Sequence, residues 1–522
     1  MLYSLGYQDF RTLREDGRTY VDKTEHIARV LRLNKYLFLA RPRRFGKSLT
    51  VSTLAELHSG DRELFAGTWA HAHWDFEAKR SSVVWLKFAS SHFATEGMEA
   101  GIHNMIDDNA ENLGVELPSR IEIGFARRFD MLLKAAAAAS PTGKTVLLVD
   151  EYDKPIVHYL GEDAPALPAG GRPQSVANRD LLKSLYAVLK DADPILSLVF
   201  LTGVSAFSKV SIFSDLNNVT NLSLHTAAAT LTGITKGELA ATYGDQLAAT
   251  GVPPEKVRRW YNGYRFAPGA ERVYNPWSLL SFLQEGRIRG FWYSTGTPTW
   301  LTRILVDAGN LDPTGADLGE ASLMGFDIDR VDPITAMFQT GYLTITDYDT
   351  EFGLFRLEYP NLEVREAFDL GLLQYITDFR GDPLTRSANL HRRLHAGDLD
   401  GVVALIDSAI ADVPHQLWQH QGESAFHLVT HVLFRTLGVR LRSEVSTARG
   451  RADAIVETPG RVYCFEFKVG ASAAEALAQI RERGYLEPHA YDSRERVAVG
   501  VSFDAERRCV GEWTSSVEGG KG

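Results

Sequence analysis

The sequence predicts an α/β protein with two structured units, an N-terminal parallel β-sheet flanked by helices and a smaller C-terminal unit of strands and helices. Three observations lead to this fold class. At 522 residues the chain exceeds one ordinary domain. From Tyr36 to about Ser223, short apolar runs alternate with helical patterns, which is the order that a parallel sheet requires. After about Arg386 a second pattern of helix and strands begins.

The N-terminal unit contains apolar runs that we expect to be strands and longer patterns that we expect to be helices. The expected strands are Tyr36–Ala40, Val83–Phe88, Thr145–Val149 and Leu196–Thr202, and the expected helices are Ser48–Leu57, Arg120–Ala139 and Asn178–Asp191. The segment Gly161–Ser175 is rich in Gly, Pro and Ala, so we expect an insertion there, either a lid or a surface loop.

The rest of the chain divides into a mixed region and a C-terminal unit. Residues 231–385 combine helical patterns with short β-like runs, and we assign them as a helical lid and connecting region. The C-terminal unit begins with an amphipathic helical stretch and ends with these predicted elements: a helix at Gly422–Leu437, two strands, a helix at Ala473–Arg483 and a strand at Arg496–Phe503. We therefore predict three parts, residues 1–230, 231–385 and 386–522.

Composition excludes several classes of protein. Hydrophobic residues make up 44 % of the chain and charged residues 23 %, as in soluble globular proteins. Met1–Phe10 lacks the basic and apolar regions of a signal peptide, and the apolar run Ile195–Phe207 is too short to span a membrane. Neither Cys464 nor Cys509 has a partner at metal-ligand spacing. The net charge of −10 argues against a protein that coats nucleic acid by bulk electrostatics. A cytoplasmic location without a membrane partner is expected.

A strand, a loop and a helix start form a candidate phosphate-binding loop. The run Tyr36–Ala40 is followed by Arg41-Pro-Arg-Arg-Phe-Gly-Lys-Ser48 and a helical pattern. In such a loop the backbone N–H groups cradle phosphates, Lys47 reaches the terminal phosphates of ATP and Ser48 ligates Mg²⁺. Arg44 and Gly46 are the other loop residues expected at the nucleotide. Arg41 occupies the position where the general pattern has glycine. A second Gly-Lys-Thr, Gly143–Thr145, precedes a strand rather than a helix and is dismissed.

An acidic strand end supports this interpretation. The run Thr145-Val-Leu-Leu-Val-Asp-Glu-Tyr-Asp153 ends in carboxylates, of which Asp150 is expected to hold Mg²⁺ through water and Glu151 to orient the attacking water. Thr202, at the end of the next strand, is expected either to contact the γ-phosphate or to satisfy a turn. The alternative is a chance helix start beside a solvated strand end.

Near the other end of the chain, two carboxylates and a lysine share one face of a predicted strand pair. Glu466 and Lys468 are two residues apart, so their side chains point to one face while Tyr463, Phe465 and Phe467 fill the other. Asp453, on the preceding strand, can meet them. Oxygen ligands for Mg²⁺ (or Mn²⁺) beside a cation are what metal-assisted phosphodiester cleavage needs. A cross-strand ion pair is the alternative.

At these residues the chain resembles two known families. Arg41–Ser48 matches the Arg-Pro-Arg-Arg-Phe-Gly-Lys-Ser/Thr hallmark of a bacterial AAA-ATPase-like family, in which Arg41 is not a departure, and further matching segments are Tyr20–Thr24, Asp150–Pro155, Thr202–Ser205, Phe213–Asn218 and Tyr274–Ser278. This resemblance covers roughly the first three hundred residues. It implies an ATP-binding P-loop NTPase, AAA-like, with a lid.

The C-terminal region, about the last one hundred residues, is similar to PD-(D/E)XK nuclease domains. The matching residues are Glu423, Gly450-Arg-Ala-Asp453, Glu466-Phe-Lys468, Gln479 and Tyr485. The resemblance implies Mg²⁺-dependent cleavage of nucleic acid, with DNA as the expected substrate. It adds Glu423 as a metal ligand from a helix. It also adds Gln479 beside the catalytic Asp453, Glu466 and Lys468.

Three further groups of residues allow both a functional and a structural interpretation. Glu423, His427 and His431 recur every four residues, but Leu428 breaks the zinc-peptidase pattern, so only Glu423 is assigned to the site. A run of arginines binds phosphates or forms a solvated face, and both interpretations stay open for Arg435, Arg440, Arg442, Arg449 and Arg451. For the aromatic cluster Trp260–Phe266, core packing is favoured over base stacking.

Three functions fit these patterns. The leading hypothesis is an ATPase module whose ATP binding or turnover controls a metal-dependent nuclease that cleaves DNA. The alternative is a nucleotide-dependent switch that binds nucleic acid or a partner without cleaving it. The third is a signalling NTPase whose output is formation of a homo-oligomer.

Overall fold

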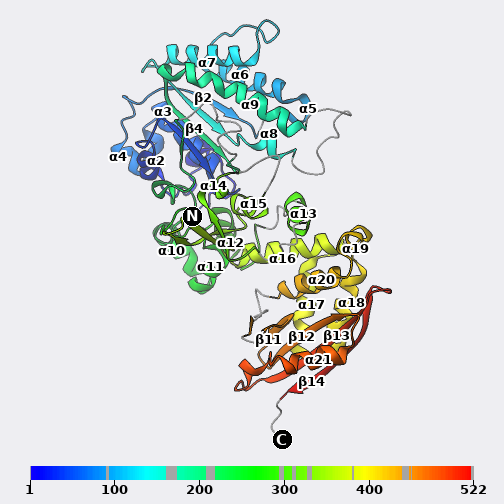
Figure 1. Cartoon of the computed structure of the whole chain (residues 1–522). Coiled ribbons are helices and arrows are strands. Elements are labelled where there is room, and N and C mark those ends of the chain that lie inside the picture. The colour runs from blue at the N-terminus through cyan, green and yellow to red at the C-terminus, as the bar shows by residue number, and fades with distance from the viewer. Residues whose placement is uncertain are drawn as a thin grey trace. The chain divides into compact units, whose positions relative to one another are not determined.

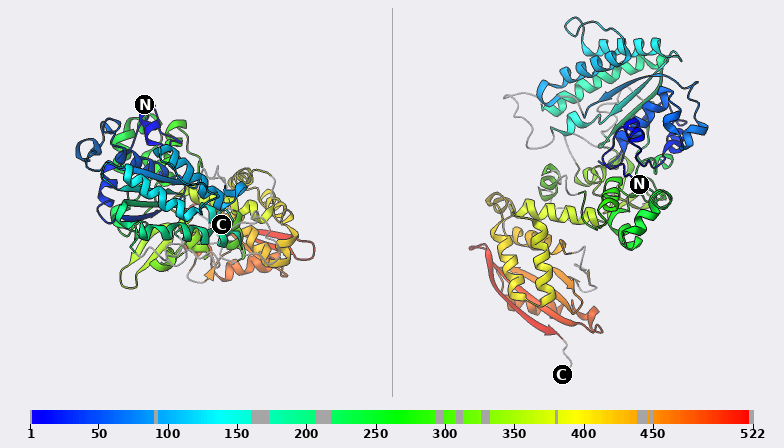
Figure 2. Two further views of the ribbon diagram at one scale, coloured as in Figure 1. Left: turned by 90° about the horizontal axis from the view of Figure 1, so that it is seen from above. Right: turned by 180° about the vertical axis from the view of Figure 1, so that it is seen from behind.

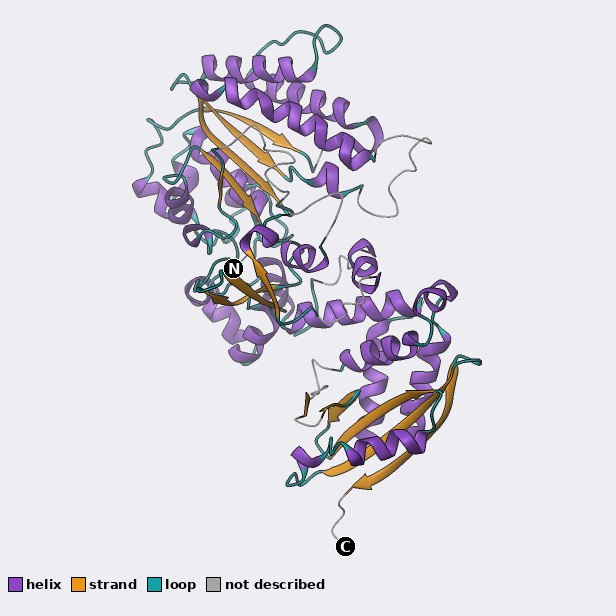
Figure 3. Cartoon of the chain, viewed as in Figure 1, coloured by secondary structure: helices purple, strands orange, loops and turns teal. Residues whose placement is uncertain are grey.

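The structure is a computed structural model of the chain, and it describes residues 2–89, 93–159, 173–206, 218–292, 299–307, 313–325, 332–378, 381–437, 446–447 and 450–518. The chain divides into two compact units (Figures 1 and 2). Unit 1 comprises Met1–Ser294 and Arg303–Val364, and unit 2 comprises Thr295–Thr302 and Arg365–Gly522. Both mix helices with strands, which confirms the predicted α/β class (Figure 3).

A five-stranded parallel sheet forms the centre of unit 1. Its strand order is β2-β3-β4-β1-β5, with β1 at Tyr36–Ala40, β2 at Ser82–Lys87, β3 at Thr145–Asp150, β4 at Leu196–Gly203 and β5 at Thr220–Asn221. Every residue of β1 and β3 is buried. Near-continuous apolar strands are typical of a parallel sheet that is covered on both faces. The four strands predicted before residue 203 are all present.

Helices cover both faces of this sheet (Figures 1 and 3). On one face α3 packs Val51, Leu54 and Leu57 against Leu37 and Leu39 of β1. The other helices before residue 192 are α1 (Phe10–Glu15), α2 (Thr24–Val30), α4 (Trp69–His73), α5 (Phe93–Glu96), α6 (Met98–Leu113), α7 (Phe125–Ala139), α8 (Lys154–Val157) and α9 (Gln174–Asp191), and α3 spans Lys47–Ser59. The helix predicted from Arg120 begins only at Phe125, after the N-cap Gly124. Most of the predicted insertion Gly161–Ser175 lies outside the described residues.

The remainder of unit 1 is only partly helical. Its helices are α10 (Lys236–Ala249), α11 (Pro254–Tyr261), α12 (Pro276–Glu285), α13 (Thr299–Asp307, which also reaches into unit 2), α14 (Glu320–Leu323) and α15 (Pro333–Thr340). An antiparallel sheet of order β6-β8-β7 accompanies them, with β6 at Ala316–Gly319, β7 at Thr344–Asp349 and β8 at Leu354–Glu358. The predicted helical lid therefore also contains a small sheet.

Short polar motifs connect the start of unit 1 to this region. Lys23 is buried and donates to both carboxylate oxygens of Glu238, at 2.6 and 2.7 Å. Glu238 also completes the capping box of α10 with Thr235. Asp22 accepts hydrogen bonds from the backbone N–H groups of Thr24 and Trp69. The segment Tyr20–Thr24 therefore has a structural role, because it connects the start of unit 1 to α10 and α4.

Unit 2 is a four-stranded sheet between helices. The order is β11-β12-β13-β14, with β11 at Ala454–Glu457, β12 at Arg461–Val469, β13 at Glu495–Asp504 and β14 at Cys509–Glu518. Strands β12 and β13 are parallel, and the other two pairs are antiparallel. The helices are α16 (Leu362–Thr377, which begins in unit 1), α17 (Pro383–Ala396), α18 (Leu399–Ala411), α19 (His415–Gln421), α20 (Ser424–Arg435) and α21 (Ala473–Glu482). The short strands β9 (Ser446–Thr447) and β10 (Gly450–Arg451) pair with each other.

The two faces of β12 contact different helices. Phe465 packs on Phe434 of α20, with ring centroids 4.8 Å apart, and the Tyr463 hydroxyl donates to the carbonyl of Leu394 in α17. Cys464, on the opposite face, lies in a cluster with Ile480 of α21. The alternation predicted for this strand is confirmed. It leaves Glu466 and Lys468 on the face that α21 covers.

The structure suggests where unit 2 can be separated. Asp369 on α16 is fully buried and lies 2.8 Å from the guanidinium of Arg435, which is itself buried. A fragment of residues 365–522 keeps this carboxylate, whereas one that begins at the predicted boundary, residue 386, loses it. Since a buried charge that loses its partner costs about 3 kcal/mol or more, we expect the shorter fragment to be less stable by that amount. Urea denaturation followed by circular dichroism measures the difference.

The replacement Asp369→Asn in the longer fragment is the matched control, because it removes the charge without shortening the chain. It should lower the free energy of unfolding in the same direction. Equal stability of the two fragments would contradict this use of Asp369 and favour the boundary at residue 386.

Candidate functional site

The candidate phosphate-binding loop joins the buried end of β1 to the start of α3. Arg44 and Gly46 both have left-handed backbone conformations, with φ of 68° and 86°. These residues bend the loop back on itself, and α3 begins at Lys47. The ammonium group of Lys47 donates to the carbonyl groups of Arg41 and Pro42, at 2.9 and 3.0 Å. Its side chain therefore lies along the inside of the loop, and Ser48 follows in the first turn. Burial lowers the pKa of Lys47, an effect opposed by Asp150, Glu151 and Asp153.

The acidic end of β3 lies beside this loop. The Thr202 hydroxyl is fully buried and donates to Asp150 at 2.6 Å, so it orients the carboxylate expected near Mg²⁺. Glu151 has a left-handed φ of 54°, is one-third exposed, and lies 3.6 Å from the ammonium of Lys154. Asp150 and Glu151 lie close enough to Lys47 to oppose the lowering of its pKa by burial. These positions bring together Lys47, Asp150 and Glu151, with Thr202 behind Asp150.

Asp153 is a residue whose role the sequence analysis missed. Its carboxylate is buried and accepts hydrogen bonds from the backbone N–H groups of Val204 and Ser205, at 3.0 and 2.6 Å. Burial raises its pKa, while these N–H groups and Lys47 act in the opposite direction. A Cβ at Gly203 would lie 2.6 Å from the Tyr152 ring, so only glycine fits there. The second Asp of Asp150-Glu-Tyr-Asp153 was the feature of the sequence that could have indicated this role.

The structure explains why arginine stands at position 41. The Arg41 side chain is buried and donates to the carbonyl groups of Ala40, Ser223 and Ala228, at 2.9, 2.7 and 2.9 Å. Its guanidinium also lies 4.0 Å from the centre of the Phe266 ring. Burial lowers the pKa of Arg41 to about 9. Arg41 therefore fastens the loop to the chain beyond β5.

The other loop side chains contact aromatic residues of unit 1. Arg44 lies over the Trp277 ring at 4.1 Å and donates to the carbonyl of Phe291 at 3.4 Å. Phe45 is buried edge-on against Tyr264 and Phe266. The expectation that Trp260–Phe266 is mainly core packing is confirmed, since Tyr261, Tyr264 and Phe266 are buried. Arg44 is thus held by Trp277 and the backbone of Phe291.

Four of the predicted nuclease residues meet on one face of the unit 2 sheet. The Lys468 ammonium donates to Glu466 Oε1 at 3.2 Å and to Gln479 Oε1 at 2.5 Å, and the Gln479 amide donates to Glu466 Oε1. Asp453 Oδ2 accepts from the backbone N–H of Phe467 at 2.7 Å. Asp453, directly before β11, strand β12 and helix α21 thus supply one cluster. Gln479 reaches it because α21 lies so close to β13 that a Cβ at Gly500 would be 2.2 Å from the carbonyl of Ala473.

The electrostatics of this cluster suit a cation. Glu466 is 3 % exposed, and its Oε2 atom has no hydrogen-bond partner. Burial first, and then the neighbouring Asp453, raise the pKa of Glu466 to about 7, against the lowering effect of Lys468. A buried carboxylate oxygen without a donor, beside a second carboxylate, fits a hard divalent ion such as Mg²⁺. Asp453 and Glu466 are the residues that would hold it.

Glu423 is not brought to this cluster. It is exposed and immediately precedes α20, whose Phe426 and Phe434 pack on Phe503 and Phe465. That is the face of the sheet opposite to Glu466. Within the described part of the chain, no group of three or more His, Cys, Asp or Glu side chains is arranged to hold a metal. Two carboxylates remain, and Mg²⁺ commonly binds through one or two while keeping several waters.

The arginine run has no single role. Arg435 is buried on Asp369 and is therefore structural, which settles one of the five. Arg440, Arg442 and Arg449 lie outside the described residues, and for Arg451 only the backbone is described. Tyr485 is buried in the apolar cluster that contains Cys464 and Ile480.

Comparison with known proteins gives matches to both units. Residues 4–213 match the family described as "Predicted AAA-ATPase", and residues 421–513 match the "PD-(D/E)XK nuclease superfamily". The "Uncharacterized protein in vnfD 5'region" of Azotobacter chroococcum mcd 1 is 34 % identical over 520 residues, which covers 97 % of each chain. The chain belongs to this family of AAA-ATPase-like proteins with a PD-(D/E)XK nuclease domain. No solved structure matches it.

The family assignment agrees with the positions of the candidate functional residues in this AAA-ATPase-like protein. The matched segments contain the loop with Lys47, the acidic strand with Asp150, and the cluster of Asp453, Glu466 and Lys468. The family features support nucleotide binding in unit 1 and nuclease chemistry in unit 2. No helix among the described residues is long and apolar enough to cross a membrane.

Proposed function

We propose that this protein is an ATP-controlled, Mg²⁺-dependent nuclease that cleaves DNA. The observation that carries the proposal is the cluster on β11, β12 and α21, where Glu466 Oε2 lacks a hydrogen-bond partner beside Asp453, Lys468 and Gln479. A structural ion pair would not require a buried carboxylate oxygen that accepts nothing.

Each residue of the cluster has its own task in this proposal. Asp453 and Glu466 hold the divalent ion, Mg²⁺ or Mn²⁺, which when bound polarises the phosphate and lowers the pKa of a bound water. Lys468 places a positive charge beside the attacking water and the developing negative charge. Gln479 keeps the Lys468 ammonium on this face, through its 2.5 Å contact.

In this proposal the nucleotide-binding module controls the nuclease and does not act independently of it. Lys47, Ser48, Asp150 and Glu151 supply the phosphate cation, the Mg²⁺ ligands and the water-orienting carboxylate that ATP hydrolysis needs. Arg41 and Arg44 tie the same loop to residues 223–291, so a nucleotide that moves the loop also acts on that region. We place the protein in the cytoplasm, where ATP, Mg²⁺ and DNA are available.

A second candidate is a nucleotide-dependent switch that binds nucleic acid or a partner without cutting it. The position of Glu423 favours it, because only two carboxylates are left at the cluster. Assembly into a homo-oligomer as the output is a third candidate. Mass measurement with and without nucleotide tests it.

The deciding experiment uses the whole chain with linear, circular and single-stranded DNA. Each substrate is incubated with Mg²⁺ or Mn²⁺, with and without ATP, and with chelator as the blank. The nuclease proposal expects metal-dependent cleavage whose rate changes with ATP. DNA binding without cleavage under every condition would replace it by the switch.

A further inference from the structure

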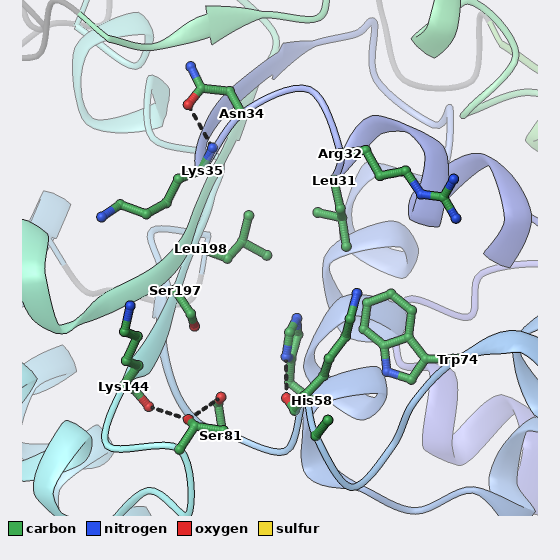
Figure 4. A pocket seen from close by; sticks show the side chains of 13 residues that line it. Leu31, Arg32, Asn34, Lys35, His58, Trp74, Ser81, Lys144, Ser197 and Leu198 are labelled. Carbon is green, nitrogen blue, oxygen red and sulfur yellow. Dashed lines mark hydrogen bonds between the residues drawn. The ribbon is translucent and has the colours of Figure 1, made fainter.

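Unit 1 contains a pocket at the N-terminal ends of its parallel strands, away from the phosphate-binding loop, which follows the C-terminal end of β1. Figure 4 shows its lining residues. The pocket has a volume of about 630 Å³ and is lined by the segments that lead into β1, β2, β3 and β4 and by the end of α3. All of these strands are parallel, and the nucleotide loop follows the other end of β1. Five residues of parallel strand span roughly 16 Å, so the two sites are distinct.

The pocket is lined by cations and by no carboxylate. Arg32, Lys35, Lys79 and Lys144 contribute to its wall, in a chain whose net charge is −10. Lys35 is paired with Asp193 at 2.7 Å, and Lys79 lies over the Trp74 ring at 4.1 Å. For Arg32, Lys79 and Lys144 the described part of the chain supplies no ion-pair partner. Such a concave set of positive charges attracts a small anion.

The floor of the pocket carries a buried hydrogen-bond acceptor. His58 is 6 % exposed, and its Nδ1 lies 2.9 Å from the carbonyl oxygen of Lys79. Because a carbonyl only accepts, Nδ1 carries the hydrogen, and Nε2 of the neutral ring is left as an acceptor. Nε2 has no hydrogen-bond partner. Burial lowers the pKa of His58, which favours this neutral form.

Part of the remaining wall is apolar. Leu31 and Leu198 line the pocket beside His58, and Figure 4 shows the Trp74 ring close to His58. The His58 and Trp74 rings meet edge to face, with centroids 5.6 Å apart. A ligand for this site thus needs an anionic group for the rim, a flat or apolar part for the wall, and an N–H group for His58.

We infer that this pocket binds a nucleoside phosphate, as a site separate from the phosphate-binding loop. Arg32, Lys79 and Lys144 receive the phosphate, and a base amino group donates to His58 Nε2 with the ring against Leu31 and Leu198. The volume lies within the roughly 300–1,000 Å³ range of small-molecule sites. A carboxylate metabolite would satisfy the cations but would leave the histidine acceptor unused.

The test uses the full chain with Lys47→Ala, so that the phosphate-binding loop does not contribute. Isothermal titration calorimetry measures binding of AMP, ADP and inorganic phosphate. AMP or ADP is expected to bind at one site, and phosphate alone more weakly. The double replacement Lys79→Glu with Lys144→Glu should weaken nucleotide binding by about tenfold or more. His58→Phe should weaken nucleotide binding and leave phosphate binding unchanged.

The matched control is Lys183→Glu, on the exposed side of α9, which should change no affinity. Melting temperatures confirm that every variant is folded, and His58→Gln, which keeps a hydrogen-bonding side chain, serves if His58→Phe does not fold. The inference is overturned if neither nucleotide binds the Lys47→Ala chain, if the double variant binds equally well, or if phosphate binds as tightly as the nucleotides. Since Lys47 is already replaced, failure here leaves the ATP-controlled nuclease proposal unaffected.

Discussion

Replacing Lys468 by alanine is expected to leave metal binding intact and to slow DNA cleavage by roughly 100- to 1,000-fold. The lysine ammonium contacts Glu466 and Gln479 but is not a ligand, so its loss removes the charge that offsets the developing phosphate charge. Asp453→Asn and Glu466→Gln should behave differently, because they remove oxygen ligands. In these two variants metal binding and cleavage should disappear together.

Metal affinity is measured by calorimetry with Mg²⁺ and Mn²⁺, and cleavage by the decay of a labelled linear duplex. Glu482→Gln on the exposed surface of α21 is the matched control, since it also neutralises a carboxylate in unit 2. It should cut at the wild-type rate. Wild-type cleavage by both Asp453→Asn and Lys468→Ala would end the nuclease assignment. Glu423→Gln completes the set, and because the helix that follows Glu423 packs on the other face, we expect a smaller effect than for Asp453→Asn.

The second large effect is expected at the phosphate-binding loop. Lys47→Ala should reduce ATP affinity by about 100-fold or more, because the only loop cation that lies inside the curve of the backbone among the described residues is removed. Glu151→Gln should bind ATP with unchanged affinity and lose turnover, since an amide cannot take up a proton from the attacking water. Binding is measured by calorimetry in chains that also carry Lys79→Glu and Lys144→Glu, so that the second proposed nucleotide pocket does not contribute, and turnover by phosphate release.

Lys183→Ala provides the control for a lost lysine in unit 1, and thermal melting separates a lost phosphate contact from a collapsed loop. The Lys47 ammonium is also a hydrogen-bond donor to Arg41 and Pro42, so a modest loss of stability is expected in addition. Equal ATP affinity of the wild type and Lys47→Ala would refute the site. ATP turnover by Glu151→Gln at the wild-type rate would remove Glu151 from its assigned role.

Local spacing was sufficient for the parts of this protein that depend on neighbouring residues. The run Tyr36–Ser48 contains the strand, the loop and the helix start in sequence, and the structure has them in that order. Glu466 and Lys468 share a face because alternate residues of any strand do so. The resemblance to known families, which is also carried by contiguous motifs, was confirmed by the matches to both units.

Contacts between distant residues were decided only by the tertiary structure. Arg41 binds carbonyl groups about 180 residues away, Arg44 lies on Trp277, and Asp369 pairs with Arg435. The same holds for Glu423, which matches a family position but precedes a helix that packs on the face opposite to Glu466. Periodicity states which residues share a face of one element, whereas the choice of the element that covers that face depends on the packing of the whole unit. The chemical groups and their local order therefore follow from the sequence, whereas the packing of each unit selects which of them meet.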